Sequence, residues 1–490
     1  MKKVKKKKIK AIKKVKKAKK TIVKKKTKEV KTIKNISKTS KSLDMFFKAE
    51  KIAVIGASHE PGKIGNIIFR NLYQRKTVYP VNPNASEIFH IKCYKSVLEI
   101  EDNIDLAIIA VKADLVPMIV EECGKKKIKN VIIVSSGFKE VGNTLLDKKL
   151  EQVLDRYGIR CVGPNCLGIL DTYSELDSIF LSKQKLKRPT QGSISFISQS
   201  GALGGMILDI ASQKRYGVAK FISYGNAMNL NECDFLEYLK DDPETKVICL
   251  YVEQIKDGQR FFEVAREVSK NKPIIVFKGG MTSEGGKAVL SHTGSLAGDA
   301  RVYQGIFKQT NLIQVDRLED LFGVAGLCEK FSDFEIKSKR IGIVTNGGGI
   351  GIVCADNIVK NNLKIADLDN STKNFLKKNL PNTINATNPI DLMGDTTDER
   401  YKIAIDAFLQ DKNTDFILVV VLYQTPLITE NVSEIIAQAD NIKKKPMIVL
   451  TSGSEQGILS RLEDKGILCF EFPEQAIEAI KKFLDAKVKG

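Results

Sequence analysis

The fold is decided first by Lys51-Ile52-Ala53-Val54-Ile55-Gly56, a short apolar run that ends in glycine. Such a run is typical of a buried strand. Helical spacing of apolar residues follows over 64–73, and a second strand pattern over 77–83 is closed by prolines. Strands that alternate with helices predict a parallel sheet with helices on both faces.

The same alternation continues along the chain. Strand patterns over 105–111 and 131–134 flank a helical pattern over 116–125, which completes a Rossmann-like domain. Apolar runs beyond it predict two more sheets. Their expected strands cover residues 193–197, 219–222, 247–252, 273–277, 340–345, 416–421 and 447–450.

The predicted fold class is therefore α/β, and 490 residues suit about three domains. Polar segments near 172–190 and 331–338 mark the boundaries. We expect a Rossmann-like domain over 44–172 and flavodoxin-like doubly wound domains over 190–331 and 338–490.

The charge of the chain is concentrated at its start. Residues 1–43 hold 21 lysines and one glutamate, whereas residues 44–490 carry 58 basic and 57 acidic residues. Such a lysine-rich segment cannot bury a core, so we expect a disordered tail that is either solvating or weakly polyanion-binding. Nothing later in the chain resembles a nucleic-acid-binding module.

Other protein classes are disfavoured by composition. No run of eighteen apolar residues occurs, so no membrane span is expected. Nine scattered cysteines and three widely separated histidines offer no obvious metal site. We expect the cysteines to be reduced core residues of a cytoplasmic protein.

Two glycine- or serine-containing segments follow predicted strands and open helices, where doubly wound sheets bind ligands. The first holds Gly56-Ala57-Ser58 and Lys63, which suit a phosphate-bearing nucleotide. The second holds Ser198, Ser200 and Gly201, whose hydroxyl and N–H groups make an anion site. An empty turn for the first segment and a simple N-cap for the second remain open.

A third segment, Gly347-Gly348-Gly349, also follows a strand and opens a helix. It indicates either a further anion-binding helix start or only a glycine-rich turn. An NAD site is disfavoured in the first domain, because the first segment is not GxGxxG. The second strand there ends in Asn82-Pro83-Asn84, without the acidic residue that ribose requires.

The candidate catalytic residues are His292 and Glu253. His292 lies among glycines that would let a loop move, and a neutral imidazole can carry a phosphoryl group near pH 7. Glu253 follows a very apolar strand at the same rim, and it would orient and stabilise the imidazole. An exposed loop histidine and a solvated glutamate are the simpler alternatives. His59 and His90 are interpreted as incidental loop residues.

Taken in order, these motifs resemble the alpha-type chain of the ADP-forming acetate–CoA ligases, in the succinyl-CoA synthetase superfamily. The resemblance runs from about residue 45 to the C-terminus. It is carried by Gly56-Ala57-Ser58, Pro61-Gly62-Lys63-Ile64-Gly65, Tyr79-Pro80-Val81-Asn82-Pro83, Ser135-Ser136-Gly137-Phe138, Gly163-Pro164-Asn165-Cys166-Leu167-Gly168, Ser198-Gln199-Ser200-Gly201, Tyr224-Gly225-Asn226, Tyr251-Val252-Glu253 and Ser291-His292-Thr293-Gly294.

The resemblance implies how the chain works. CoA would bind the first domain, phosphate would convert an acyl-CoA to an acyl phosphate, and His292 would take the phosphoryl group beside Glu253. The helix starts at 198–201 and 347–349 would cradle phosphate. The CoA-binding residues that it implies are Gly56, Ala57, Ser58, Lys63, Asn82, Ser135, Ser136 and Asn165.

The resemblance also implies a partner. No stretch reads as an ATP-grasp domain, so ADP, ATP and Mg²⁺ would bind a separate beta-type subunit in a heterodimer or heterotetramer. The substrates would be CoA, phosphate and a small carboxylic acid, usually acetate in this family. The alternatives are a non-catalytic CoA-binding regulatory homologue, a nicotinamide oxidoreductase and a nucleic-acid-binding protein.

Overall fold

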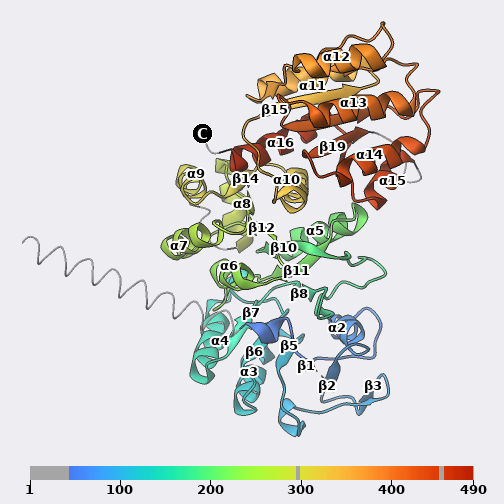
Figure 1. The fold of residues 1–490 in the computed structure, drawn as a ribbon. Coiled ribbons are helices and arrows are strands. Elements are labelled where there is room, and N and C mark those ends of the chain that lie inside the picture. Colours follow the sequence, from blue (N-terminus) through green and yellow to red (C-terminus); the bar gives the residue numbers. More distant parts are fainter. Residues whose placement is uncertain (1–42, 294–297, 452–456, 489–490) are drawn as a thin grey trace, which may run out of the picture. The chain divides into compact units, whose positions relative to one another are not determined.

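A computed structural model describes residues 43–293, 298–451 and 457–488 (Figure 1). Apart from Leu43, the predicted tail over 1–43 lies outside the described residues. The chain forms two compact units, which are described separately. Unit 1 holds the residues up to Ser182 together with Ser223–Pro243, and unit 2 holds Lys183–Ile222 and Glu244 onward.

Unit 1 contains a five-stranded parallel sheet in the order β2-β1-β5-β6-β7. Its first strand lies between the second and the third, so the direction of the connections reverses between β1 and β5. Ligands bind at the carboxyl ends of strands at such a point. The strands are β1 (Lys51–Ile55), β2 (Thr77–Val81), β5 (Leu106–Ile109), β6 (Asn130–Ile133) and β7 (Arg160–Val162).

Helices bury both faces of this sheet. Alternate residues of β1, β5 and β6 form one apolar cluster with residues of α3 and α4, while α2 contacts β1 and β2. The helices are α2 (Ile64–Leu72), α3 (Val116–Lys125), α4 (Thr144–Tyr157) and α6 (Glu232–Asp241). Short elements complete the unit: η1 (Asp44–Phe46), β3 (Glu87–Ile88), β4 (Ile91–Lys92), η2 (Val97–Glu99), η3 (Ala113–Leu115), η4 (Lys139–Val141), β8 (Gly168–Asp171) and β9 (Leu176–Asp177).

The strands of unit 2 that belong to its first sheet follow the same order of connections as the sheet of unit 1. These strands run β14-β13-β12-β10-β11, so the first strand again lies between the second and the third. The strands are β10 (Gln191–Ser198), β11 (Val218–Ser223), β12 (Val247–Val252), β13 (Ile274–Lys278) and β14 (Ile313–Val315). The helices are α5 (Gly201–Gln213), α7 (Gly258–Val268), α8 (Ser283–Thr293), α9 (Ala300–Gln309) and α10 (Leu318–Phe331).

The second sheet of unit 2 is also parallel, with the order β16-β15-β18-β19-β20 and with β17 paired to the end of β15. Its strands are β15 (Arg340–Thr345), β16 (Lys364–Ile365), β17 (Ile390–Asp391), β18 (Phe416–Val421), β19 (Met447–Thr451) and β20 (Cys469–Phe470). Its helices are α11 (Gly348–Lys360), α12 (Asn370–Asn379), α13 (Asp398–Gln410), α14 (Asn431–Asn441), α15 (Ile458–Asp464) and α16 (Pro473–Lys487).

The predicted α/β class and parallel sheets are confirmed, and helix α3 has the predicted bounds. The short strands β7, β14, β16, β17 and β20 were not predicted, because two or three residues give no periodic signal.

The segment Ser223–Pro243 belongs to unit 1, although it falls inside the predicted domain 190–331. Asn229 joins this segment to unit 1, because its side-chain amide accepts a hydrogen bond from Cys161 N at 2.9 Å and donates one to Ile159 O at 2.9 Å.

A second difference concerns His292. The sequence predicted a glycine-flanked loop over 291–298, but α8 includes residues up to Thr293, so His292 lies in a helix. Of the glycines before His292, Gly279 and Gly280 precede α8, whereas Gly285 and Gly286 lie inside it. Residues 294–297 lie outside the described residues.

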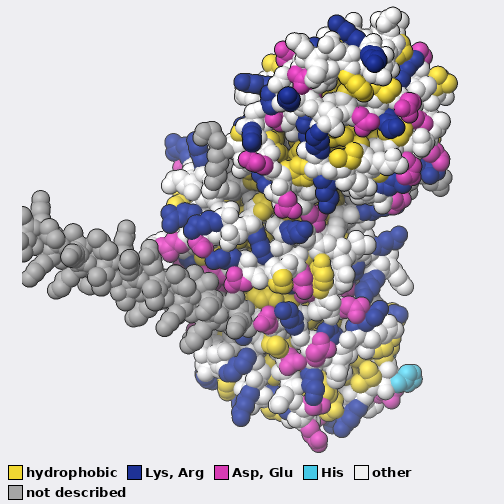
Figure 2. Space-filling view, in the orientation of Figure 1, with side chains coloured by type: hydrophobic (Ala, Val, Ile, Leu, Met, Phe, Trp, Pro, Cys, Tyr) yellow, Lys and Arg dark blue, Asp and Glu magenta, His cyan; other side chains and the backbone are white. Residues whose placement is uncertain are grey.

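The described surface carries mixed charge. Figure 2 shows basic and acidic side chains interspersed on the visible face, in keeping with the near balance of residues 44–490. Among the described residues, no helix is long and apolar enough to cross a membrane.

Substitution of Gly65 tests how tightly the first strand-to-helix turn is packed. A Cβ at Gly65 would lie 1.9 Å from Gly56 O, whereas one at Gly258 would meet nothing within 4 Å. We expect Gly65→Ala to lower the free energy of unfolding by about 1–3 kcal/mol, and Gly258→Ala to change it by less than about 0.5–1 kcal/mol. Urea denaturation measures both, and equal effects would contradict the packing argument.

Candidate functional site

In unit 1 the predicted CoA-binding residues gather at the carboxyl ends of the strands. Gly56 follows β1 at φ +87°, and a Cβ there would lie 2.3 Å from Ala110 O, so only glycine fits without strain. Asn82, after β2, donates from Nδ2 to Ala57 O at 2.9 Å. The turns after β1 and β2 are thereby joined beside the point where the strand order reverses.

Ser135 joins the next two loops. Its hydroxyl accepts from Val111 N at 3.2 Å, and its carbonyl accepts from Asn165 N at 2.9 Å. Ser136 is exposed, and Lys63 is exposed and paired with Glu60 at 2.9 Å. Ser58 is buried, and its hydroxyl accepts from Glu60 N at 3.1 Å.

Glu140 and Asn226 belong to this rim, and neither was assigned a role from the sequence. Glu140 accepts from Gly137 N at 2.6 Å and from Asn226 Nδ2 at 2.6 Å. Burial raises the pKa of Glu140, but these hydrogen bonds outweigh it and hold the pKa below its usual value. The loop that carries Ser135 and Ser136 is therefore fixed by a carboxylate.

In unit 2 the candidate phosphate segment and Glu253 meet where the strand order reverses. β10 and β12 are neighbours, and their register places Ser198 opposite Tyr251. Gln199 joins the two strand ends, because its Oε1 accepts from Glu253 N at 2.7 Å and from Gln254 N at 3.0 Å. The Ser198–Gly201 segment and Glu253 therefore form one rim.

The serines of this segment have local partners. Ser200 is the N-cap of α5 and accepts from Leu203 N at 3.3 Å, and Ser198 donates to Ser200 O at 2.7 Å. Ser200 is therefore an N-cap, as one of the two interpretations expected, and this capping leaves the prediction of an anion site open. The first N–H groups of α5, beginning at Gly201, carry the positive end of the helix dipole, so they still attract an anion.

Glu253 is buried, with 5% of its surface exposed, so the solvated-glutamate alternative is wrong. Its Oε1 accepts from Tyr251 Oη at 3.1 Å. Burial and the neighbouring carboxylate raise the pKa of Tyr251 well above its usual value, so the phenol remains a donor. Glu253 is therefore oriented by a neutral hydroxyl.

The chain leads from this rim into the helix that carries His292. β13 lies beside β12 and leads through Gly279 into α8, which carries His292. A Cβ on Gly279 would lie 2.7 Å from Tyr251 Oη and 3.6 Å from Glu253 Cγ, so the segment between β13 and α8 begins beside Glu253. The side chain of His292 lies outside the described residues, and its expected contact with Glu253 stays a prediction.

His90 pairs with Glu87 at 3.1 Å on the surface of unit 1.

The third predicted segment opens α11. Gly347 is the N-cap of α11, and Gly348 and Gly349 are its first residues, without a side-chain cap. Asn346 accepts from Leu422 N at 2.8 Å and donates to Leu422 O at 3.0 Å, which joins the ends of β15 and β18. This helix start therefore also lies where the strand order of its sheet reverses.

Asp391 lies beside this helix start, and the sequence gave no signal for it. A Cβ on Gly348 would lie 2.7 Å from Asp391 Oδ2, whereas one on Gly349 would meet nothing within 4 Å. The space over Gly349 is therefore open, while that over Gly348 is limited by a carboxylate.

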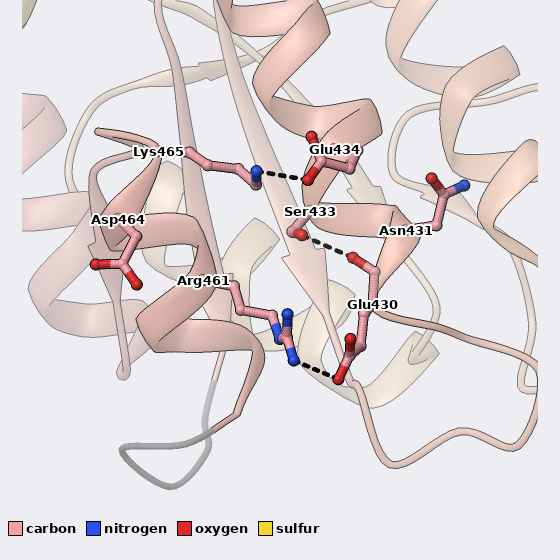
Figure 3. Close-up of a pocket in the computed structure, with 7 residues that line it drawn as sticks. All are labelled: Glu430, Asn431, Ser433, Glu434, Arg461, Asp464 and Lys465. Carbon is pink, nitrogen blue, oxygen red and sulfur yellow. Dashed lines mark hydrogen bonds and ion pairs between the residues drawn. The ribbon is translucent and has the colours of Figure 1, made fainter.

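A groove of about 460 Å³ lies between α14 and α15 (Figure 3). Its cations are paired with its acids, Arg461 with Glu430 at 2.5 Å and Lys465 with Glu434 at 2.5 Å. It contains none of the predicted site residues, and its paired charges do not favour an anion. The lining residues are Glu430, Asn431, Ser433, Glu434, Arg461, Asp464 and Lys465.

Family models match most of the described chain. A CoA binding domain matches residues 50–172, a succinyl-CoA ligase like flavodoxin domain matches 191–328, and a ligase-CoA domain matches 341–480. Together with the three rims, these matches define the class of CoA ligases that combine a CoA-binding domain with flavodoxin-like domains.

Relatives narrow this class. The chain is 39% identical to the alpha subunit of acetate–CoA ligase (ADP-forming) II of Pyrococcus furiosus, covering 89% of this chain and 96% of that subunit. It is 42% identical to acetate–CoA ligase (ADP-forming) of Methanocaldococcus jannaschii, covering 90% of this chain but only 63% of the longer relative. The chain belongs to the ADP-forming acetate–CoA ligase family.

A solved structure agrees with this assignment. The fold matches acetyl-coenzyme A synthetase 1 of Ca. Korarchaeum cryptofilum, described as dinucleotide forming and solved with phosphate and ADP. The TM-score is 0.84 at 34% identity, and the match covers 91% of this chain and 97% of that chain.

Lys278 gives the site a measurable pH signature. Burial lowers the pKa of Lys278 to about 8, although the charge of Glu253 opposes this. Between pH 8 and about 10.5 the unfolded chain then binds more protons than the folded chain, so this group makes the protein more stable as pH rises. We expect the unfolding free energy of the wild type, relative to Lys278→Met, to rise by up to about 3 kcal/mol across this window. A flat difference in denaturation experiments would contradict the burial of a charged Lys278.

Proposed function

We propose that this chain is the alpha-type chain of an ADP-forming acyl-CoA ligase. The observation that carries the proposal is the rim of unit 2, where a buried Glu253 is tied through Gln199 to the start of α5. The proposed reaction is reversible, and it converts acyl-CoA, phosphate and ADP to free acid, CoA and ATP. Acetate is the expected acid, as the names of the relatives suggest.

In the first step, acyl-CoA binds the rim of unit 1 through the residues around Gly56, Asn82, Ser135 and Asn165. A phosphate oxygen attacks the thioester carbon, the C–S bond breaks, and the CoA thiolate leaves and takes a proton. The N–H groups at the start of α5 stabilise the negative charge on phosphate. The product is an acyl phosphate.

In the second step, a ring nitrogen of His292 attacks phosphorus, and the bond from phosphorus to the carboxylate oxygen breaks. The free acid leaves and His292 carries the phosphoryl group. Glu253 accepts a hydrogen bond from the other ring nitrogen and stabilises the charged ring. Transfer of the phosphoryl group to ADP breaks the P–N bond and gives ATP.

The last transfer requires a nucleotide site, and we propose that a separate ATP-grasp subunit supplies it with Mg²⁺. The relatives support this division, because the chain spans nearly all of a protein named an alpha subunit and only 63% of a longer ligase. We propose a heterodimer or heterotetramer. All nine cysteines are described as thiols, eight of them buried, and this supports the predicted cytoplasmic location.

Labelling of the complex tests the proposal. With acetyl-CoA and ³²P-phosphate but no ADP, we expect acid-labile, base-stable label on this chain. His292→Ala should abolish the label, and Glu253→Gln should slow its appearance by about 10²–10³-fold because the charged ring loses its partner. Wild-type labelling and turnover in His292→Ala would contradict the role of His292, whereas a wild-type complex that neither labels nor turns over would favour the non-catalytic CoA-binding regulatory alternative.

The start of α11 is the proposed second phosphate site, and a pair of glycine variants tests it. In Gly349→Ala the methyl group enters the open space over the helix start, so we expect turnover to fall while stability changes by less than about 1 kcal/mol. Gly258→Ala, at the first position of α7, is the control and should keep full turnover. If Gly349→Ala turns over like the control, phosphate does not approach this helix start.

A further inference from the structure

Lys278 is a buried cation at the end of an inner strand, where apolar residues are the rule. Only 4% of its surface is exposed. Its register partner is Val252, the residue before Glu253. Burying an ammonium group is costly unless it is hydrogen-bonded and its charge is compensated, so a specific set of partners must hold it.

Those partners belong to the rim that carries Glu253. Lys278 Nζ donates to Glu253 O at 2.7 Å and to Gly279 O at 2.5 Å, and it lies 4.5 Å from the centre of the Tyr303 ring. The charge of Lys278 also interacts with that of Glu253. The ammonium group therefore joins the segment after β12 to the segment that leads into α8.

Tyr303 extends this connection from α9. Its hydroxyl accepts from Ile255 N at 3.2 Å, two residues after Glu253. The main chain over 253–255 is thus held at Glu253 N by Gln199, at Glu253 O by Lys278 and at Ile255 N by Tyr303. Of these three, Lys278 alone contributes a positive charge.

We propose that Lys278 is a positioning residue for phosphoryl transfer: it fixes the main chain of Glu253 and holds a positive charge beside its carboxylate. The proposal rests on the proposed function, in which Glu253 stabilises the phosphorylated His292. Lys278 itself touches neither phosphate nor the imidazole in this proposal. It acts by keeping Glu253 in one place relative to the start of α5.

A purely structural role makes a different prediction, and Lys445 provides the matched control. Lys445 Nζ also donates to two carbonyl oxygens, those of Phe408 and Asp411, at the end of α13. Burial lowers its pKa to about 8, as for Lys278. Lys445 is half-buried, and Lys445→Met therefore removes a lysine with the same kind of hydrogen bonds from a segment that contains none of the predicted site residues.

The test compares Lys278→Met, Lys278→Arg and Lys445→Met in the complex with the nucleotide-binding subunit. The readouts are the rate of ³²P-phosphate incorporation in the presence of acetyl-CoA without ADP, and the KM for acetyl-CoA. We expect Lys278→Met to slow incorporation by about 10²-fold, since a small displacement of a catalytic group has that effect. Its KM should stay within twofold, Lys278→Arg should recover part of the rate, and Lys445→Met should react like the wild type.

Hydrogen exchange of the peptide that covers 251–256 gives a readout that does not depend on activity. In Lys278→Met we expect its exchange to accelerate at least tenfold, and in Lys445→Met we expect no change. Wild-type exchange in Lys278→Met overturns the positioning role even if no variant takes up label. Equal loss of rate in the two methionine variants also overturns it. Absence of label from the wild type, with accelerated exchange in Lys278→Met, would instead refute the proposed function alone.

Discussion

The whole arrangement depends on the reversal of strand order in parallel sheets. When the first strand lies between the second and the third, the connections after the first and third strands leave toward opposite faces and open a crevice at their carboxyl ends. In unit 2 this constraint brings together Ser198 after β10 and Glu253 after β12. In unit 1 it brings Gly56 after β1 beside Ala110 after β5. The order of the strands therefore determines where the candidate site residues lie.

The side chains then make the rim of unit 2 rigid at a cost in stability. Glu253 and Lys278 are both buried, and each would be unfavourable alone. Tyr251 donates to the carboxylate of Glu253, carbonyl groups accept from Lys278, and Gln199 holds the main chain at Glu253. Gly279 leaves the space that Tyr251 needs. In the proposed function, a glutamate whose carboxylate and main chain are both held by hydrogen bonds is preorganised, so less reorganisation is needed when charge develops on a neighbouring ring.

Much of this could be predicted from the sequence, because parallel strands buried on both faces give long apolar runs. The strands at 340–345 and 416–421 and helix α3 have the predicted bounds. The glycine and serine segments were found because they interrupt these runs at the ends that bind ligands. Glu253 was found for the same reason, as the first charge after an apolar strand.

The rest could not be predicted for physical reasons. Two-residue strands such as β16 and β17 carry no periodicity. Gln199, Asp391 and Tyr303 act through contacts distant in sequence, and a single chain gives no signal of such pairs. Lys278 did carry a signal, since it is the one charged residue in the predicted strand's continuation, Pro273 to Lys278. The glycines around His292 indicated a loop, yet α8 includes that histidine, because a helix tolerates a glycine at a modest cost.

The most direct test of the central claim is a crystal structure of the complex with inorganic phosphate and no nucleotide. We expect a phosphate within hydrogen-bond distance of the first N–H groups of α5, on the side of Glu253. Phosphate bound elsewhere, with the start of α5 unoccupied at concentrations that support turnover, would contradict the central claim.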